Sequence, residues 1–530
     1  MSGAPDIAAE AGPLEPEPVV ACLANGRPSL TYSITFHQPG GRLCISLDEL
    51  DRQARRVALH LKRLGIRPGD RIGILARNRL EWVLLDLAAL KIKAVTAGFE
   101  AGKVETTPDL IDRYGLSLLF TDQQPGDRWR GDPRIHPIAR LLADIEGIPD
   151  NPDLPPVTYD PDDVTTIKFT SGSTGQPKGL AARAGSIDGS LSAVQALFRH
   201  RPIDRLFVFL PLSLLQQRYW IYSALAFGHN VVVATYEMAF HALRREEPTV
   251  VMGVPAFFEA LRKDIESRIT GRDGGGSAQA ASNRAAVART VLGSHIRYLW
   301  TGSAPASPGL LAFFESCGLP IFEGYGMNET CIVTKNTPAA HRTGSVGRPV
   351  PGKRVTLDKD GVIIVHSDQP VNSAYLFAAP GESERLFLPD GGVRTGDLGR
   401  IDADGYLYIL GRVDDVVVLE NGRNVLARPL EERLRTCPAV TDGVIVGAGC
   451  GTLQAIVCAS GGEADRGVIE QHIALMNRDA GRDERIGGLV IADEPFSIEN
   501  GLLTSQYKPR RNAILARYGR ALAPTKGDEL

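Results

Sequence analysis

The chain of 530 residues is too long for one ordinary domain, and its 43% apolar and 23% charged residues are typical of a large globular protein. Its 59 basic and 62 acidic residues leave a net charge of -3 without long runs of one sign. This balance argues against a nucleic-acid partner and favours a small-molecule partner.

The seven cysteines are scattered along the chain without CxxC spacing, so we predict neither a disulfide framework nor a zinc site and expect a reducing, cytoplasmic location. Residues 1–18 lack the basic start and the apolar core of a secretion signal. The richest apolar stretch, residues 206–220, is interrupted by Pro211 and turns polar before it reaches membrane-spanning length. We therefore expect no transmembrane segment, and the sequence leaves peripheral membrane contact open.

The first predicted helix begins near residue 46, where Ser46 and Glu49 have the spacing of a capping box. A helical stripe of apolar residues follows, and Gly65 ends it before the strand-like "DRIGILA". Asn78 and Glu81 repeat the capping spacing before a second helix.

Short apolar runs then alternate with helical stretches, which predicts parallel sheets covered by helices. These runs are "LSLLFTD", "RLFVFLP", "NVVVATY", "PTVVMGVP" and "IRYLWTG". The segment 270–286 is rich in Gly, Ser and Ala and is interpreted as a flexible insertion. The sequence thus predicts an α/β fold, with a large N-terminal domain of helix-covered sheets over residues 1–411.

After residue 411 the predicted elements become shorter. Asn421 and Gly422 lie between two β-prone runs, which is a strong hairpin signal. The helix-like "PLEERLRT" and the strand-like "DGVIVGAG" follow. We predict a small α+β domain over residues 412–530.

The glycine-rich stretch "FTSGSTGQPKGL", residues 169–180, is the clearest chemical signal of the chain. Glycines let backbone N–H groups converge on a ligand, hydroxyl side chains add donors, and Lys178 adds a mobile positive charge, which together suit a polyphosphate. The stretch lacks the GK[ST] of a Walker loop and the G-x-S-x-G of a nucleophile elbow. A solvated turn after a strand is the alternative interpretation.

This stretch resembles the signature loop of the adenylate-forming superfamily of acyl-CoA synthetases, luciferases and peptide-synthetase adenylation domains. The resemblance continues through "GSAPAS", "EGYGMNET", "GSVGRPVPG", "RTGDLGRIDADGYLYILGR" and "NGLLTSQYKPRR", in the order typical of that superfamily. Within it, the chain looks most similar to long-chain fatty-acyl-CoA synthetases. The resemblance implies that a carboxylate attacks the α-phosphate of ATP and that a thiol, that of CoA, captures the resulting acyl-adenylate.

The resemblance also implies the binding site for ATP and Mg²⁺. Glu329 and Thr174 would hold the magnesium ion, although a lone glutamate at this kind of position is more often just the start of a helix. Asn328 stands where the superfamily usually has threonine, and its amide can still donate a hydrogen bond to phosphate. The residues placed around the nucleotide are Thr170, Ser171, Gly172, Ser173, Thr174, Gly175, Lys178, Gly302, Ser303, Ala304, Gly324, Tyr325, Gly326, Met327, Asn328, Asp397 and Arg412.

Asp397 would accept hydrogen bonds from both ribose hydroxyls, and Arg412 would pair with ribose or phosphate oxygens; a turn aspartate and a solvated arginine are the alternatives. Asp415 matches the hinge about which the small domain of the superfamily rotates. Lys508 matches the catalytic lysine that meets the carboxylate and the α-phosphate, and a basic tail is its alternative. With Glu329 and Thr174, Lys508 completes the predicted catalytic set.

Three further departures from the pattern of the superfamily concern packing and contacts. Val393 replaces a tryptophan, Asp414 replaces a lysine, and Leu214 replaces a histidine or an aromatic residue. We expect the first change to affect packing, and the second leaves the contacts between the domains open.

An acyl pocket is expected near residues 212–220, 254–258 and 300–303, which are mostly apolar. A fatty acid is favoured by the resemblance, with an aryl acid as the alternative. The acceptor thiol is expected to be CoA, with an acyl carrier protein as its alternative. A non-catalytic nucleotide-binding relative remains a third interpretation, although Lys508, Glu329 and the glycine loop are all present.

Overall fold

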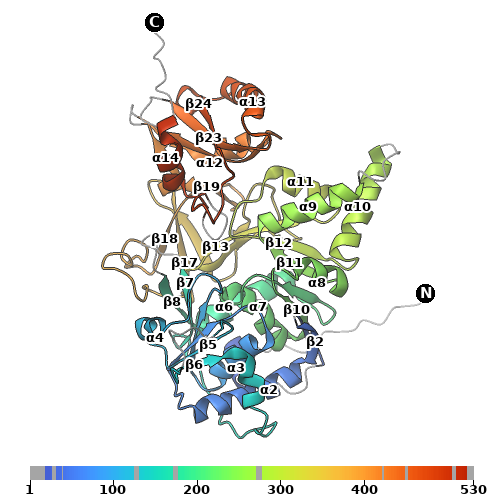
Figure 1. Cartoon of the computed structure of the whole chain (residues 1–530), viewed down its shortest axis with the longest axis vertical. Coiled ribbons are helices and arrows are strands. Elements are labelled where there is room, and N and C mark those ends of the chain that lie inside the picture. Colours follow the sequence, from blue (N-terminus) through green and yellow to red (C-terminus); the bar gives the residue numbers. More distant parts are fainter. Residues whose placement is uncertain are drawn as a thin grey trace, which may run out of the picture.

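The computed structural model describes residues 18–26, 31–38, 40–124, 131–170, 177–269, 277–419, 423–447, 452–503 and 509–521. Figure 1 shows a large body that contains the N-terminal three quarters of the chain and a smaller C-terminal part above it. The mixed α/β architecture predicted from the alternating apolar runs is therefore confirmed.

The first sheet of the large body has six strands in the order β6-β5-β3-β4-β7-β8. Five of these strands are parallel, and β8 returns antiparallel to β7. The glycine-rich stretch thus connects two neighbouring strands at one edge of the sheet. The strands are β3 (Arg71–Leu75), β4 (Val95–Phe99), β5 (Leu118–Thr121), β6 (Ile135–Pro137), β7 (Val164–Thr170) and β8 (Lys178–Arg183).

The second sheet has nine strands in the order β15-β14-β13-β12-β11-β9-β10-β1-β2. Its six central strands are parallel, and antiparallel strands close both of its ends. The strands are β1 (Ser33–Gln38), β2 (Gly41–Ser46), β9 (Arg205–Val208), β10 (Asn230–Ala234), β11 (Val250–Gly253), β12 (Tyr298–Thr301), β13 (Ile321–Met327), β14 (Cys331–Lys335) and β15 (Arg348–Pro349).

The helices of the large body cover the faces of these two sheets. The largest apolar cluster joins side chains from both sheets with side chains of α3, α6 and α7, so these helices lie between the sheets. A second cluster packs α8 to α11 on the other face of the nine-stranded sheet. The helices are α1 (Val19–Asn25), α2 (Leu47–Arg63), α3 (Leu80–Lys91), α4 (Pro108–Tyr114), α5 (Leu141–Asp144), α6 (Ala184–Phe198), α7 (Leu215–Ser223), α8 (Ala239–Glu246), α9 (Pro255–Ile269), α10 (Ser277–Leu292) and α11 (Pro308–Ser316).

A four-stranded antiparallel sheet follows the large sheets and leads toward the C-terminal part. Its strands are β16 (Lys353–Leu357), β17 (Val362–Ser367), β18 (Val393–Ile401) and β19 (Leu407–Arg412). Because β19 ends at Arg412, the observed elements agree with a change of architecture near the proposed boundary between residues 411 and 412. That boundary remains a proposal.

The C-terminal part packs three helices on a three-stranded sheet and has its own apolar clusters on the two sheet faces. The hairpin predicted around residues 421 and 422 is confirmed by the antiparallel pairing of β20 and β21, although residues 420–422 lie outside the described ranges. The elements are β20 (Val416–Val418), β21 (Asn424–Leu426), β22 (Val440–Gly447), β23 (Leu453–Ala459), β24 (Ile486–Ile491), α12 (Ala427–Leu434), α13 (Arg466–Arg478) and α14 (Arg511–Tyr518).

Two local predictions are corrected by the structure, while the first capping prediction is confirmed. The Ser46 hydroxyl accepts from the Glu49 backbone N–H at 3.1 Å and caps α2. Asn78 does not cap α3, because its amide instead donates to the carbonyls of Leu210 and Ala234. Residues 277–286 of the supposed flexible insertion belong to α10, since their many alanines favour a helix.

Within the described ranges, none of the helices combines the length and the apolar content needed to cross a membrane.

Candidate active site

The candidate site lies where the carboxyl ends of strands from both large sheets meet. Thr170 ends β7, and it pairs with Lys178 at the start of β8. In the other sheet, β13 ends at Met327 and returns as β14 through a turn in which the Thr330 N–H donates to the Met327 carbonyl. Asn328 and Glu329 occupy the two central positions of this turn, so Glu329 projects from the end of the sheet. Edges of this kind are common ligand-binding places in α/β proteins.

Gly326 is required by the close return of β14 after this turn. A Cβ atom at residue 326 would lie 2.0 Å from the carbonyl oxygen of Cys331, which no side chain could tolerate. A register irregularity falls between Tyr325 and Gly326. The glycine of "EGYGMNET" therefore permits the tight strand pairing that holds Glu329 at the edge of the sheet.

Tyr325, Asp397 and Arg412 form the first polar group of the site. The Tyr325 hydroxyl donates to Asp397 Oδ2 at 2.6 Å, and the Arg412 guanidinium lies 3.5 Å from Asp397 Oδ1. Asp397 and Arg412 are brought together because they pair in register across β18 and β19. Burial, and then the Asp397 carboxylate, raise the pKa of the Tyr325 phenol, which thus stays a donor at neutral pH. The group presents a carboxylate and a half-exposed guanidinium beside the aromatic ring of Tyr325.

Glu329 and Tyr375 form the second polar group. The Tyr375 hydroxyl donates to Glu329 Oε1 at 2.6 Å, and residue Glu329 is 6% exposed. Burial, and then the negative charge of Glu329, raise the pKa of Tyr375. A carboxylate has about four lone-pair sites, and the contact with Tyr375 uses one of them.

Lys178 is paired with Glu382, its Nζ atom lying 2.7 Å from Glu382 Oε1. The same Nζ atom lies 5.3 Å from the centre of the Tyr375 ring. Both partners come from the segment between β17 and β18, which a pair of backbone hydrogen bonds between Gly179 and Leu376 holds against β8. Sequence reasoning did not identify Tyr375 or Glu382. Nothing in their local sequence marks them, because their roles arise from contacts with distant residues.

A third group lies beneath the turn that carries Glu329. Lys168 Nζ lies 3.4 Å from Cys331 Sγ, and the Tyr219 hydroxyl lies 3.3 Å from the same sulfur atom. Burial by itself raises the pKa of a thiol, yet the Lys168 ammonium and the Tyr219 hydroxyl together lower the pKa of Cys331. This contact joins β7 of one sheet to β14 of the other. Lys168 and Cys331 are not among the site residues predicted from the sequence.

The loop after β12 lies against the strand that carries Tyr325. A Cβ atom on Gly302 would approach the Gly324 carbonyl to 3.3 Å, and Ser303 has a left-handed backbone with φ of 68°. The Ala306 N–H donates to Glu323 Oε1 at 3.4 Å. Burial raises the pKa of the Glu323 carboxyl to about 7. The predicted residues 302–304 are thus beside the predicted residues 324–326.

Some of the predicted site residues lie outside the described ranges, namely Ser171, Gly172, Ser173, Thr174, Gly175 and Lys508. Their roles, and those of the other predicted residues, stay predictions. Asp415, the predicted hinge residue, ends the short 3-10 helix Val413–Asp415 that follows β19, and the Arg511 guanidinium lies 3.6 Å from its carboxylate. Val393 is buried at the start of β18, which agrees with an effect on packing.

No group of three or more His, Cys, Asp or Glu side chains among the described residues could enclose a metal ion. A single carboxylate such as Glu329 nevertheless suits Mg²⁺, which commonly takes one or two carboxylates together with substrate phosphates and water. The predicted partner Thr174 is not among the described residues.

Comparison with protein families gives two matches that together span most of the chain. Residues 26–369 match the model of the AMP-binding enzyme family, and residues 414–521 match that of the AMP-binding enzyme C-terminal domain. Among curated proteins, the chain is 29% identical to long-chain-fatty-acid–CoA ligase FadD15 of Mycobacterium tuberculosis, with 76% of this chain and 75% of the relative covered. It is 26% identical to 2-succinylbenzoate–CoA ligase of Bacillus subtilis, with 76% of this chain and 80% of the relative covered.

Solved structures show the same fold. ATP-bound MatB from Rhodopseudomonas palustris superposes with a TM-score of 0.76 at 22% identity, covering 95% of this chain and 99% of that chain. The o-succinylbenzoate CoA synthetase MenE from Bacillus subtilis, in complex with the acyl-adenylate intermediate OSB-AMP, has a TM-score of 0.74 at 21% identity, covering 93% and 97%. The predicted two-part architecture is confirmed at the level of the fold.

Proposed function

Because the chain belongs to the family of AMP-binding enzymes, we propose that it is an acyl-CoA synthetase. It would use ATP to convert a carboxylic acid into an acyl-adenylate with release of pyrophosphate, and then form the CoA thioester with release of AMP. The observation that carries this proposal is the meeting of Tyr325, Asp397 and Arg412 with the Glu329 and Lys178 groups at one edge of the two sheets.

The adenylation step brings two anions together, a carboxylate and a triphosphate. Positive charge and hydrogen-bond donors must therefore be in place before the reaction, so that little reorganisation accompanies the transition state. Lys178 would supply one such charge to the β- and γ-phosphates by exchanging Glu382 for phosphate oxygens. The residues of the 171–176 stretch would add backbone and hydroxyl donors, and Lys508 would meet the carboxylate and the α-phosphate.

Magnesium fits the Glu329 carboxylate, because Tyr375 occupies only part of its acceptor capacity and orients it. When bound, the ion would neutralise phosphate charge. Tyr375 holds the carboxylate by a charge-assisted hydrogen bond and would keep it aimed at the same position through the reaction.

The nucleoside would lie at the group formed by Tyr325, Asp397 and Arg412. Two carboxylate oxygens of Asp397 can accept from two neighbouring ribose hydroxyls, and the guanidinium of Arg412 can contact ribose or phosphate oxygens. The adenine would rest against Tyr325 and the backbone of Gly324 and Gly326.

Thioester formation would follow a rotation of the C-terminal part about Asp415, which removes Lys508 from the site. We propose CoA as the acceptor because the curated relatives reported above are CoA ligases. Transfer to the phosphopantetheine of a carrier protein is the outcome that would replace this assignment.

The proposal is tested with the purified full chain, ATP, Mg²⁺ and a panel of aliphatic and aryl acids, scored for pyrophosphate release with and without CoA. We expect acid-dependent pyrophosphate release and a CoA thioester. Asp397→Asn should raise the KM for ATP at least about tenfold, as expected for a charge-assisted contact. The matched control is Asp163→Asn, which removes a carboxylate paired with Lys93 away from the site and should leave that KM unchanged. Failure of every acid would contradict the proposed function.

A further inference from the structure

Three aromatic side chains fill the interior beneath the candidate site. We call Phe198 of α6, Trp220 of α7 and Trp300 of β12 the aromatic floor; each is less than 5% exposed. Trp300 lies two residues before Gly302, which abuts Gly324, and Trp220 follows Tyr219, whose hydroxyl contacts Cys331 beneath the Glu329 turn. The floor thus lies between the two sheets, on the inner side of the polar groups proposed to bind the reacting atoms.

Trp300 is held by contacts with several neighbours. Its ring stacks on Phe198 with centroids 5.3 Å apart and packs edge-on against Trp220 at 5.1 Å. The Lys335 Nζ atom lies 3.7 Å from the centre of the Trp300 ring, and it is anchored by donating to the Phe322 carbonyl at 2.7 Å. Moving the indole aside would break all of these contacts at once, which is costly in a close-packed interior.

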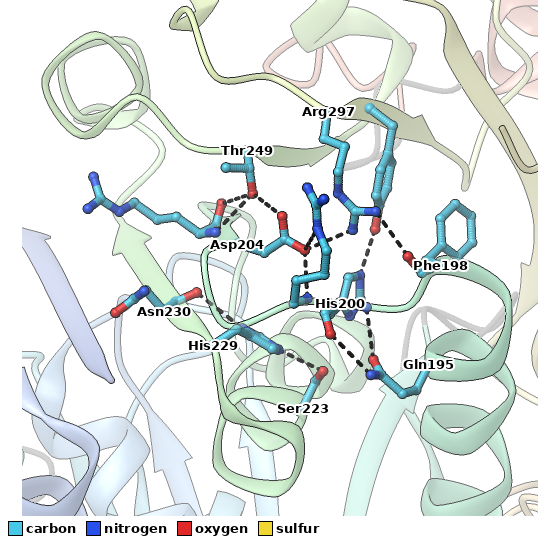
Figure 2. Close-up of polar contacts among 12 residues, drawn as sticks. Gln195, Phe198, His200, Asp204, Ser223, His229, Asn230, Thr249 and Arg297 are labelled. Atoms are coloured by element: carbon cyan, nitrogen blue, oxygen red, sulfur yellow. Dashed lines mark hydrogen bonds and ion pairs between the residues drawn. The ribbon is translucent and has the colours of Figure 1, made fainter. Parts of the chain in front are cut away.

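A polar network, drawn in Figure 2, adjoins the aromatic floor, since the His200 ring packs edge-on against Trp220 with centroids 5.6 Å apart. His200 Nε2 lies 2.6 Å from the Tyr298 hydroxyl, and the His229 ring packs edge-on against His200 at 5.4 Å. His229 Nε2 in turn lies 2.8 Å from the Ser223 hydroxyl.

The Asp204 carboxylate of the same network accepts from Arg297 at 2.9 Å and from Thr249 at 3.0 Å. An acyl chain that passed the floor would enter this network and separate polar groups of which His200, His229 and Asp204 are buried. Buried polar groups without partners are strongly unfavourable, so the network bars the way for methylene groups.

We propose that the aromatic floor ends the acyl pocket, so that the enzyme takes compact acids, either short straight-chain acids or single-ring acids, in place of long-chain fatty acids. This inference rests on the proposed function and names its substrate class. It makes Trp300 and Trp220 the residues that determine specificity. It also separates this chain from FadD15, whose name states a long-chain substrate and to which the chain is 29% identical.

The first test measures kcat/KM of the wild-type chain for butanoate, hexanoate, octanoate, dodecanoate, hexadecanoate and benzoate, with ATP, Mg²⁺ and CoA. A single excess methylene in a filled pocket changes kcat/KM by roughly tenfold or more. We therefore expect hexadecanoate to be at least about a hundredfold worse than the best of butanoate, hexanoate and benzoate. Equal or better use of hexadecanoate would overturn the inference while leaving the proposed function intact. Pyrophosphate release with none of the acids would overturn both.

The second test replaces a tryptophan of the aromatic floor with the smaller leucine. It measures the ratio of kcat/KM for dodecanoate to kcat/KM for hexanoate. Trp300→Leu and Trp220→Leu should each raise this ratio at least about tenfold. Phe314→Leu is the matched control, because Phe314 is fully buried on the other face of the nine-stranded sheet. It should lower stability without changing the ratio. Thermal unfolding of each variant identifies any that fails to fold, in which case the wild-type panel still decides. Folded tryptophan variants with an unchanged ratio would contradict the inference.

Discussion

Tyr375→Phe removes one hydroxyl and leaves the ring beside Lys178 in place, so it isolates the hydrogen bond to Glu329. That bond joins a neutral donor to a carboxylate over 2.6 Å. Hydrogen bonds to charged groups contribute about 1.5 to 3 kcal/mol when the partner is buried, and Glu329 is 6% exposed. If the whole contribution serves to hold Glu329 toward Mg²⁺, the loss corresponds to about a 10- to 150-fold weaker apparent affinity for the ion.

The assay is the Mg²⁺ dependence of pyrophosphate release at saturating acid, because a purely structural tyrosine would change stability without changing this dependence. The KM for the acid should stay within about twofold of the wild-type value, since Tyr375 touches the carboxylate proposed to hold the metal and not the acyl pocket.

Tyr518→Phe is the matched control, because the Tyr518 hydroxyl donates to Asp493 at 2.5 Å in the C-terminal part. It should leave the Mg²⁺ dependence unchanged. A role of Tyr375 in holding Glu329 toward Mg²⁺ is refuted if Tyr375→Phe and Tyr518→Phe both keep the wild-type Mg²⁺ dependence, or if both shift it equally.

Three other outcomes are expected. Lys178→Met should raise the KM for MgATP at least about tenfold and leave acid binding unchanged, whereas Glu382→Gln, which frees Lys178, should lower that KM by about two- to fivefold; steady-state kinetics with ATP as the varied substrate checks both. Lys508→Ala should slow adenylate formation at least about a hundredfold while supplied acyl-adenylate still reacts with CoA at a near-normal rate; equal damage to both half-reactions would contradict a role limited to adenylation. Burial raises the pKa of the Glu323 carboxyl from its usual 4.5 to about 7. The contribution of this group to the free energy of unfolding is therefore most favourable below about pH 4.5, and it is lost as the pH rises through 7. Glu323→Gln should therefore match the wild type in acid and exceed its free energy of unfolding by up to about 3 kcal/mol at pH 8.5, as measured by urea unfolding; a difference independent of pH would contradict this cause.

The regular elements could be predicted where one segment contains its own signal. The capping box at Ser46 and Glu49 needs only four consecutive residues, and the short apolar runs need only their neighbours to become parallel strands. Asn78 shows the limit of such reasoning, because its spacing suits a cap while its side chain bonds to carbonyls more than a hundred residues away. The local sequence permits Asn78 to cap the helix, but its tertiary hydrogen bonds place the side chain elsewhere.

The candidate site divides in the same way. Tyr325, Glu329 and Asp397 lie in motifs that resemble those of known enzymes, so their meeting could be expected from the sequence. Tyr375 and Glu382 lie in no motif, and backbone hydrogen bonds such as those between Gly179 and Leu376 hold their segment against β8. Site residues that lie within a local motif can be predicted from the sequence. Residues that reach the site through contacts between distant segments cannot be predicted in this way.

The turn between β13 and β14 shows how backbone strain supports the site. Cys331 adopts a left-handed backbone with φ of 55°. This conformation costs residues other than glycine about 1 to 2 kcal/mol. A glycine at this position would relieve that strain, yet it would remove the thiol that contacts both Lys168 and Tyr219. Those contacts tie the end of β14 to β7 and to α7, and the left-handed turn lets the chain reverse with Glu329 at its tip. The strain at Cys331 is therefore offset by the contacts that join the two sheets directly beneath the carboxylate proposed to hold the metal.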